Sequence, residues 1–212
     1  MRVLIIGAGG LGCPAALALK GQHALTLADP DVVELSNLHR QILYGRDDLG
    51  KPKAVVAAER VGATPLQLRV TADNAPDLFR RQDVVIDATD GGQTKLALSD
   101  AAVHTGVPLV YGGVLREHGQ AMVIRPGGPC LRCLFAEAVE GPSCAQAGIL
   151  GTVAGVVGTR QAELALAPQD GLHVFDGKRL HWRTVAVRRA KDCPVCPASV
   201  DITKEVCPMT YV

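Results

Sequence analysis

The sequence predicts an α/β fold built on a mainly parallel β-sheet. Short apolar runs such as Val3–Ile6, Ala24–Ala28 and Asp83–Asp87 alternate with helix-like stretches of about ten residues, which is the pattern of βαβ units. The runs are continuously apolar, as in strands whose two faces are both covered. After residue 112 the pattern changes to strand pairs, so the parallel sheet is expected to continue into antiparallel strands.

The elements of the first half follow from their composition. Val3–Ile6 and Ala24–Ala28 are predicted to be buried strands, and Leu11–Lys20 between them is predicted to be a helix that starts at a glycine-rich turn. Gly50–Arg60 is rich in alanine and valine and is predicted to be a helix. Leu66–Val70 alternates in polarity, which is typical of a strand.

The rest of the chain contains more strands than helices. Strands are predicted at 83–87, 107–111, 120–125, 172–175 and 179–187, with helices at 95–105 and about 148–166. Asp176-Gly177 lies between the last two strands and is a strong hairpin signal.

Composition excludes several classes of protein. Lys and Arg number 22 against 21 Asp and Glu, which gives a formal net charge of +1 and argues against a basic nucleic-acid binder. Aromatic residues make up 3%, which argues against a base-stacking platform, and 48% hydrophobic residues exclude disorder for most of the chain. No segment resembles a signal peptide or a membrane span, so a cytoplasmic protein without a membrane partner is expected.

A glycine-rich turn follows the first predicted strand. Gly7-Ala8-Gly9-Gly10-Leu11-Gly12 fits G-x-G-x-x-G between a strand and a helix, where backbone amides can hold a phosphate. Asp29 ends the second strand, where an acid can bind ribose hydroxyls. A tight turn without a ligand is the alternative, but strand, turn, helix and acid together favour a nucleotide site in a Rossmann-like fold. By this motif alone NAD is the leading nucleotide.

The segment after Asp29 does not suit a dehydrogenase. A polar loop replaces the expected helix and contains Arg40, and Lys53 follows it. An arginine can bind phosphate oxygens in bidentate fashion, and a lysine can neutralise charge on them. Asp90 follows a strand end, where a carboxylate facing phosphates requires a cation such as Mg²⁺. Each residue alone is more often a solvated surface charge, but together they indicate triphosphate chemistry.

These motifs, in this order and spacing, resemble a known family. They are Gly-Ala-Gly-Gly-Leu-Gly, Asp29-x-Asp31, Ser36-Asn37-Leu38-x-Arg40-Gln41, Gly50-x-Pro52-Lys53 and Thr89-Asp90. The chain resembles the ThiF/MoeB/HesA proteins, the ubiquitin-activating-enzyme-like adenylyltransferases, from Val3 to about Cys196. The resemblance implies ATP-dependent adenylation of the C-terminal Gly-Gly carboxylate of a ubiquitin-like sulfur carrier, with release of pyrophosphate.

The resemblance also implies a role for each matching residue. Asp29 would bind the ribose, Lys53 would offset charge in the transition state, and Asp90 would hold Mg²⁺. The ATP site would comprise Gly7, Gly9, Gly10, Gly12, Asp29, Asn37, Arg40, Gln41, Lys53 and Asp90, with Arg40, Lys53 and Asp90 also catalytic. The carrier's carboxylate is already a nucleophile, so no general base is required.

Four of the seven cysteines form two C-x-x-C pairs. Cys130 and Cys133 are one pair, and Cys193 and Cys196 are the other. Four thiolates from two such turns can make a closed tetrahedral Zn²⁺ site of the structural kind. A redox dithiol is the alternative, but two pairs favour zinc, and the family carries zinc at the matching positions.

The other three cysteines have separate interpretations. Cys144 precedes a glycine-rich helix, and the resemblance to the thiamine-type relatives implies a thioester or acyl disulfide with the carrier, against an inert loop thiol as the alternative. Cys13 lies inside the first helix and is expected to pack in the core. Cys207-Pro208 resembles the start of TusA-type sulfur-relay domains, so the chain is divided into an adenylyltransferase domain at 1–198 and a TusA-like tail at 199–212.

Two other functions remain open at this point. Relatives of this kind begin with an arginine-bearing arm before the first strand, whereas this sequence starts at the strand, which leaves a non-catalytic carrier-binding protein as one alternative. An NAD(P)-binding oxidoreductase is the other, but it leaves Arg40, Lys53 and the cysteine pairs unexplained. The implied partners are the sulfur carrier, a second copy in a homodimer and a cysteine desulfurase or sulfurtransferase, in thiamine or molybdopterin biosynthesis.

Overall fold

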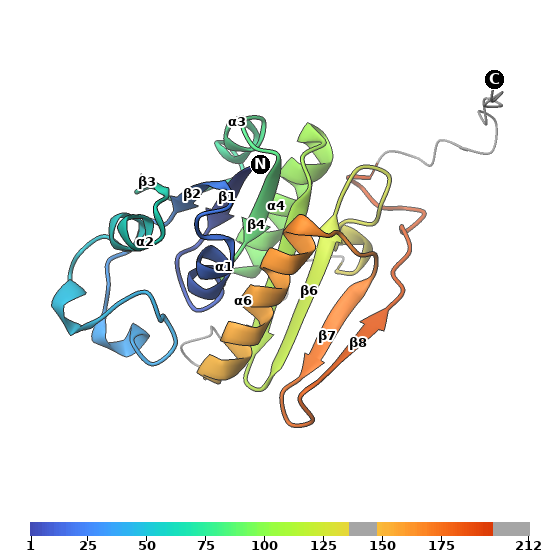
Figure 1. The fold of residues 1–212 in the computed structure, drawn as a ribbon. Coiled ribbons are helices and arrows are strands. Elements are labelled where there is room, and N and C mark those ends of the chain that lie inside the picture. The colour runs from blue at the N-terminus through green and yellow to red at the C-terminus, as the bar shows by residue number, and fades with distance from the viewer. Residues whose placement is uncertain (136–147, 197–212) are drawn as a thin grey trace, which may run out of the picture.

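A computed structural model of the chain describes residues 1–135 and 148–196. Its strands form one sheet in the order β3-β2-β1-β4-β5-β6-β7-β8 (Figure 1). The strands are β1 (Arg2–Ile6), β2 (Ala24–Ala28), β3 (Thr64–Leu66), β4 (Val84–Asp87), β5 (Leu109–Leu115), β6 (His118–Ile124), β7 (Leu172–Asp176) and β8 (His181–Val185). The helices are α1 (Gly12–Leu19), α2 (Lys53–Val61), α3 (Ala75–Phe79), α4 (Gly92–Thr105) and α6 (Gly151–Leu166), with short turns η1 (Leu35–Asn37), η2 (Arg46–Asp48) and η3 (Leu131–Cys133).

Strand direction changes once, as the sequence predicts. The first five strands pair in parallel, with β1 in the middle between β2 and β4, and β5 to β8 pair antiparallel. Helical crossovers connect the parallel strands, whereas short turns connect β5 to β6 and β7 to β8. The predicted α/β fold, a Rossmann-like parallel sheet that continues into antiparallel strands, is therefore confirmed.

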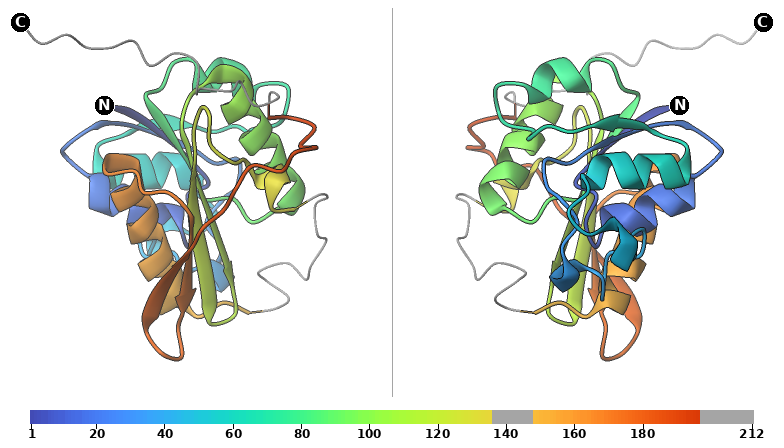
Figure 2. Two further views of the ribbon diagram at one scale, coloured as in Figure 1. Left: turned by 90° about the vertical axis from the view of Figure 1, so that its right-hand side faces the viewer. Right: turned by 90° about the vertical axis from the view of Figure 1, so that its left-hand side faces the viewer.

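The sheet has one hydrophobic core on each face. Residues of α1, α2 and α6 pack on one side with Val3 and Ile5, and residues of α3, α4 and η3 pack on the other with Leu4 and Ile6. Alternate residues of β1 point to opposite faces, so a strand covered on both faces has to be apolar throughout. Figure 2 shows the sheet edge-on with the two helical layers on either side of it.

Two element boundaries differ from the sequence prediction. The third strand is Thr64–Leu66 rather than 66–70, because β2 already ends at Ala28 and leaves the later residues without a neighbour. The second helix begins at Lys53 rather than at residue 50, because residues 50–52 form a turn and an isolated bridge that hydrogen-bond to Val33 and pair with Val32. Pro52 then stands at the N-cap, where its missing N–H costs no helical hydrogen bond.

The two hairpins differ in detail from their sequence prediction. β5 continues to Leu115 and returns through a tight turn in which Arg116 adopts a positive φ of 54°. β7 and β8 are joined by a four-residue turn, since Asp176 pairs with His181, so Asp176-Gly177 does not form a two-residue hairpin loop by itself. Gly177 is required at that turn because a Cβ there would lie 2.5 Å from the Glu117 carbonyl oxygen. No helix within 1–135 or 148–196 is long and apolar enough to cross a membrane.

Candidate nucleotide site and four-cysteine centre

The predicted nucleotide-binding residues gather at the carboxyl ends of the three central parallel strands. Ile6 of β1 is in register with Ala28 of β2 and with Asp87 of β4, so the loops that follow these strands start side by side. In open α/β sheets this edge is where ligands bind, next to the point where the strand order reverses. β1 is at that point here, because β2 and β4 lie on its two sides.

The glycine-rich loop uses its glycines in two different ways. A Cβ on Gly7, which has φ of +97°, would lie 2.6 Å from the Ala88 carbonyl oxygen, and a Cβ on Gly12 would lie 1.8 Å from that of Gly7. These two glycines therefore allow the loop, strand and helix to pack closely. Gly9 is different, because in the described part of the chain the only neighbour within 4 Å of a Cβ placed on it is the Gln41 amide nitrogen, at 3.7 Å. The loop thus leaves room at Gly9 for a ligand atom.

Asp29 holds this loop from the next strand. One carboxylate oxygen accepts the Ala8 N–H at 2.7 Å and the other accepts the Asp31 N–H at 2.8 Å. Burial raises the pKa of Asp29, and the two backbone hydrogen bonds act in the opposite direction. The acid that is predicted to bind the ribose therefore also holds the glycine-rich loop through the Ala8 N–H.

The polar loop that follows Asp29, called the polar insert below, places Arg40 and Gln41 against the glycines. The Arg40 side chain would lie 3.5 Å from a Cβ on Gly10, and its guanidinium donates to the Ser36 carbonyl at 3.1 Å. Gln41 is 4% exposed and faces Gly9, and its buried side-chain oxygen has no hydrogen-bond partner among the residues that the structure describes. Asn37 is also buried, and its side-chain oxygen is unpaired within residues 1–135 and 148–196, while its amide nitrogen donates to the Ser36 hydroxyl. Buried polar atoms without partners are rare, and these two lie in the segment predicted to bind phosphates.

Lys53 begins α2 and is 7% exposed. Its ammonium lies 3.6 Å from the Asp31 carboxylate, and Asp31 in turn donates its backbone N–H to Asp29. Lysine is almost never buried without a partner. The structure therefore joins Lys53 to the same group of side chains as the glycine-rich loop and Asp29.

Two residues that sequence reasoning did not assign hold the insert in place. The Tyr44 hydroxyl donates to the Ala8 carbonyl at 2.7 Å and is 3.3 Å from the Lys53 carbonyl. The buried Asp48 carboxylate pairs with Arg60 of α2 and accepts the Gly45 N–H at 2.8 Å. Polar side chains in a loop carry no signal of their own in a sequence, so only the fold reveals that these contacts tie the insert to the loop and to α2.

Cys13 packs next to Tyr44, in the core position that the sequence predicts. It is fully buried, and its thiol lies 3.4 Å from the Ala8 carbonyl oxygen. Burial raises the pKa of Cys13 to about 12. It is therefore a core thiol, since only the thiolate is an effective nucleophile.

Asp90 lies three residues beyond the end of β4 and is exposed. Its loop is adjacent to Gly7 through Ala88, which places it on the same edge of the sheet. Asp87, by contrast, is fully buried and pairs with Lys95 at 3.3 Å, a contact that the sequence did not indicate. Cys144 lies outside the described residues, as do Cys207 and the rest of the predicted tail.

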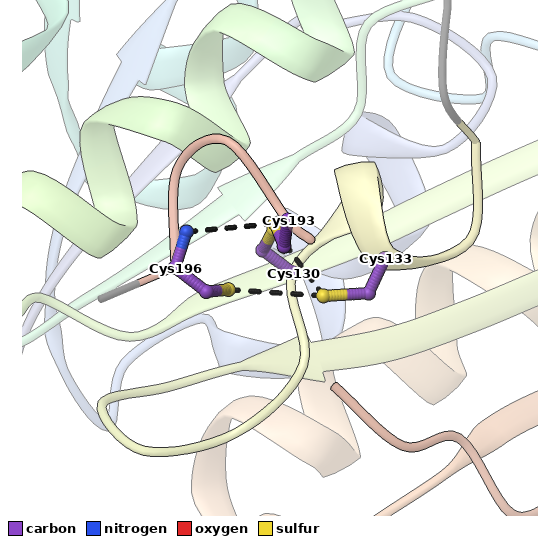
Figure 3. A group of neighbouring side chains, drawn as sticks. All are labelled: Cys130, Cys133, Cys193 and Cys196. Carbon is purple, nitrogen blue, oxygen red and sulfur yellow. Dashed lines mark hydrogen bonds between the residues drawn. The ribbon is translucent and has the colours of Figure 1, made fainter. Parts of the chain in front are cut away.

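The two cysteine pairs meet on the α4 face of the sheet, although 59 residues separate them in the chain (Figure 3). The sulfur–sulfur distances are 3.9 Å for Cys130–Cys133, 3.5 Å for Cys130–Cys193 and 3.7 Å for Cys133–Cys196. Tetrahedral zinc with Zn–S bonds of about 2.3 Å places its sulfurs about 3.8 Å apart. The four thiols therefore fit a closed zinc site, and all four sulfurs lie within 4.8 Å of one another.

Comparisons with known proteins agree with these two sites. Residues 1–195 match the ThiF family. The chain belongs to the ThiF family. It is 42% identical over 217 residues to the sulfur carrier protein ThiS adenylyltransferase of Escherichia coli, covering 93% of this chain and 86% of that protein. It is 41% identical over 215 residues to the SAMP-activating enzyme E1 of Haloferax volcanii, covering 92% and 80%.

Among solved structures, E. coli MccB with MccA-N7isoASN has the same fold. The TM-score is 0.78 at 19% identity, and the match covers 92% of this chain and 66% of that one. The family predicted from the motifs is therefore confirmed, and so is the prediction of an adenylyltransferase, an activity that uses ATP. The roles of the individual site residues stay predictions.

Proposed function

We propose that this ThiF-family protein adenylates the C-terminal Gly-Gly carboxylate of a ubiquitin-like sulfur carrier and releases pyrophosphate. The observation that carries the proposal is the convergence of Arg40, Gln41 and Lys53 around the glycine-rich loop. A dinucleotide-binding fold does not need the two cations of this group, Arg40 and Lys53, whereas a triphosphate does. The names of the E. coli and H. volcanii relatives support the same class of substrate.

The reaction requires alignment and charge neutralisation rather than a base. A carboxylate oxygen of the carrier would form a bond to the α-phosphorus of ATP as the bond from that phosphorus to pyrophosphate breaks. Both reactants are anions, so cations at the phosphates lower the barrier more than a general base would. Arg40 lies along Gly10 and Lys53 faces Asp31, so both lie beside the loop where the phosphates would bind.

Two metal ions are assigned to separate places. Asp90 is exposed at the carboxyl edge, and one or two protein carboxylates beside substrate phosphates are the usual ligands of Mg²⁺. Bound there, Mg²⁺ would offset charge on the pyrophosphate. Zinc would be held by the four cysteines and would have a structural role, because no ligand position is left open.

We assign the adenylyltransferase domain to residues 1–198, and the tail from residue 199 to a TusA-like sequence. A homodimer and a cysteine desulfurase or sulfurtransferase that supplies sulfur are the further partners proposed. Cys144 is proposed to take part in covalent transfer of the carrier.

ATP–pyrophosphate exchange tests the function directly. The purified protein is incubated with ATP, Mg²⁺, labelled pyrophosphate and one Gly-Gly-ended carrier at a time. We expect label to enter ATP only when the carrier is present, because the reverse reaction requires the acyl-adenylate. A carrier that lacks its last glycine is the control. Absence of exchange with every Gly-Gly-ended carrier would contradict the proposal.

The two kinds of glycine in the loop give a matched pair of variants. Gly9→Ala is expected to change the free energy of unfolding by less than about 0.5 kcal/mol, because its Cβ has room, yet to weaken ATP binding at least about tenfold. Gly7→Ala is expected to cost more than about 2 kcal/mol, because its Cβ meets a backbone carbonyl at a positive φ. Denaturant unfolding and calorimetric titration with ATP measure both. Equal ATP affinity in Gly9→Ala and wild type would refute a phosphate site at Gly9.

A further inference from the structure

A lysine is largely buried in the first turn of α4. The Lys95 ammonium donates to the Gly112 carbonyl at 2.6 Å and lies 3.3 and 3.4 Å from the two carboxylate oxygens of Asp87. It also lies 5.2 Å from the centre of the Tyr111 ring. The Lys95 side chain is 12% exposed and that of Asp87 is fully buried. The two polar partners are Asp87, the last residue of β4, and Gly112, in the middle of β5.

This position is unfavourable for a cation. The N-terminus of a helix carries a partial positive charge, and the first turn of α4 contains no acidic residue to offset it. Removing the charge from water adds a further cost, which a buried ion pair repays only when its hydrogen bonds are satisfied. An unfavourable charge in a family of enzymes that bind anions indicates a role beyond packing.

The lysine bridges a gap between two strands of unequal length. β4 ends at Asp87, which pairs with Tyr111, whereas β5 continues from Gly112 to Leu115. Lys95 bonds to both strands at the point where they part. The Lys95 side chain therefore links the end of β4 to β5, next to the turn that carries Asp90.

The same carboxylate also fixes the turn that leads to Asp90. One oxygen of Asp87 accepts the Thr89 N–H at 3.0 Å and the Thr89 hydroxyl at 2.7 Å. The fully buried Gln161 of α6 donates its amide to the Asp87 carbonyl at 2.7 Å and to that of Val110 at 3.0 Å. Gly112 makes room for that amide, since a Cβ there would be 2.3 Å away. The start of the turn is thus held from α4, β5 and α6.

We propose that Lys95 is a positioning residue for the proposed Mg²⁺-binding turn at Asp90, acting through Asp87 and the start of α4. This inference rests on the proposed function, because it gives Asp90 a metal to hold. Without the ammonium, Asp87 loses its charge partner and the Gly112 carbonyl loses its donor, so the turn between β4 and α4 loses its contact with α4 and β5 and becomes more mobile. Groups that orient a metal ligand typically change metal affinity or activity about 10- to 100-fold when they are removed.

Lys95→Gln tests the proposal, with Lys95→Arg as the conservative variant and Lys20→Gln as an exposed control. We expect Lys95→Gln to raise the Mg²⁺ concentration for half-maximal pyrophosphate exchange at least about tenfold and to lower kcat, while the KM for the carrier stays unchanged. Lys95→Arg should restore the Mg²⁺ requirement to within about threefold of wild type. Should Lys95→Gln not fold, the double variant Asp87→Asn/Lys95→Gln, which removes both buried charges, replaces it with the same expected result.

A second measurement does not depend on activity. Hydrogen–deuterium exchange of the amides of residues 88–92 should be at least about tenfold faster in Lys95→Gln than in Lys20→Gln. Faster amide exchange would support the role of Lys95 in the turn even in a protein that is inactive with every carrier. That inactivity would contradict the proposed function. Unchanged amide exchange together with an unchanged Mg²⁺ requirement in an active protein would overturn the inference and leave the function standing.

Discussion

Lys53→Ala is expected to lower the rate of ATP–pyrophosphate exchange by at least about 10²- to 10³-fold while the protein stays folded. The ammonium of Lys53 is the buried cation beside the glycine-rich loop, and its nearest carboxylate, Asp31, is largely exposed. Loss of the lysine removes charge stabilisation that has to act on two approaching anions, and mobile water does not replace an ammonium that is already held in place.

The fold should tolerate this change for two reasons. Alanine is the best helix former, and Lys53 is the first residue of α2. Asp31, with 56% of its side chain exposed, can be solvated when its partner is lost, so the free energy of unfolding is expected to fall by about 1 kcal/mol or less. Thermal unfolding with and without ATP measures this quantity.

Lys51 provides the matched control two residues earlier. Its side chain is 57% exposed and contacts only the Asp48 carboxylate among the ion pairs of the described residues, at 3.7 Å. Lys51→Ala removes the same charge from the same segment and is expected to keep exchange within about threefold of wild type. Equal losses in the two variants would show that general positive charge, rather than the buried ammonium, supports the reaction.

The parts of the fold that the sequence predicts best are those with local signals. The apolar runs of β1, β2 and β4, the glycine-rich loop and the two cysteine pairs each depend on short-range periodicity or spacing. Their positions also imply which loops share an edge, because parallel strands end together. That is why Gly9, Asp29, Arg40 and Lys53 can be expected at one edge from the sequence alone.

Contacts between distant segments cannot be predicted in the same way. Lys95 looks like an ordinary helix lysine, and Tyr44 like an ordinary loop aromatic, until β5 and the glycine-rich loop are placed beside them. The third strand differs from its prediction for a related reason, because its length is set by where β2 ends and not by its own alternation of polarity. Strand limits of this kind are properties of the sheet rather than of the segment.

Replacing Cys130 with serine is expected to abolish zinc binding at the proposed four-cysteine site and to lower the free energy of unfolding by about 4 kcal/mol or more. Cys130 is fully buried, and its sulfur faces those of both Cys133 and Cys193. A metal held by two pairs that 59 residues separate closes a long loop, for which the chain-entropy relation gives about 4 kcal/mol. Zinc content per chain and the denaturation midpoint are the two measurements.

Cys13→Ser is the control for Cys130→Ser. It places the same serine hydroxyl at a buried cysteine that is not one of the four proposed zinc ligands. Cys13 is equally buried, but its sulfur faces the Ala8 carbonyl, to which a serine hydroxyl can still donate. This variant should keep its full zinc content and lose less than about 2 kcal/mol of stability. Addition of a chelator should then destabilise wild type and Cys13→Ser by the same amount but leave Cys130→Ser unchanged, because linkage to the metal is already lost in that variant. A wild-type protein that contains no zinc as purified, or a Cys130→Ser variant as stable as Cys13→Ser, would contradict a structural metal at the four cysteines.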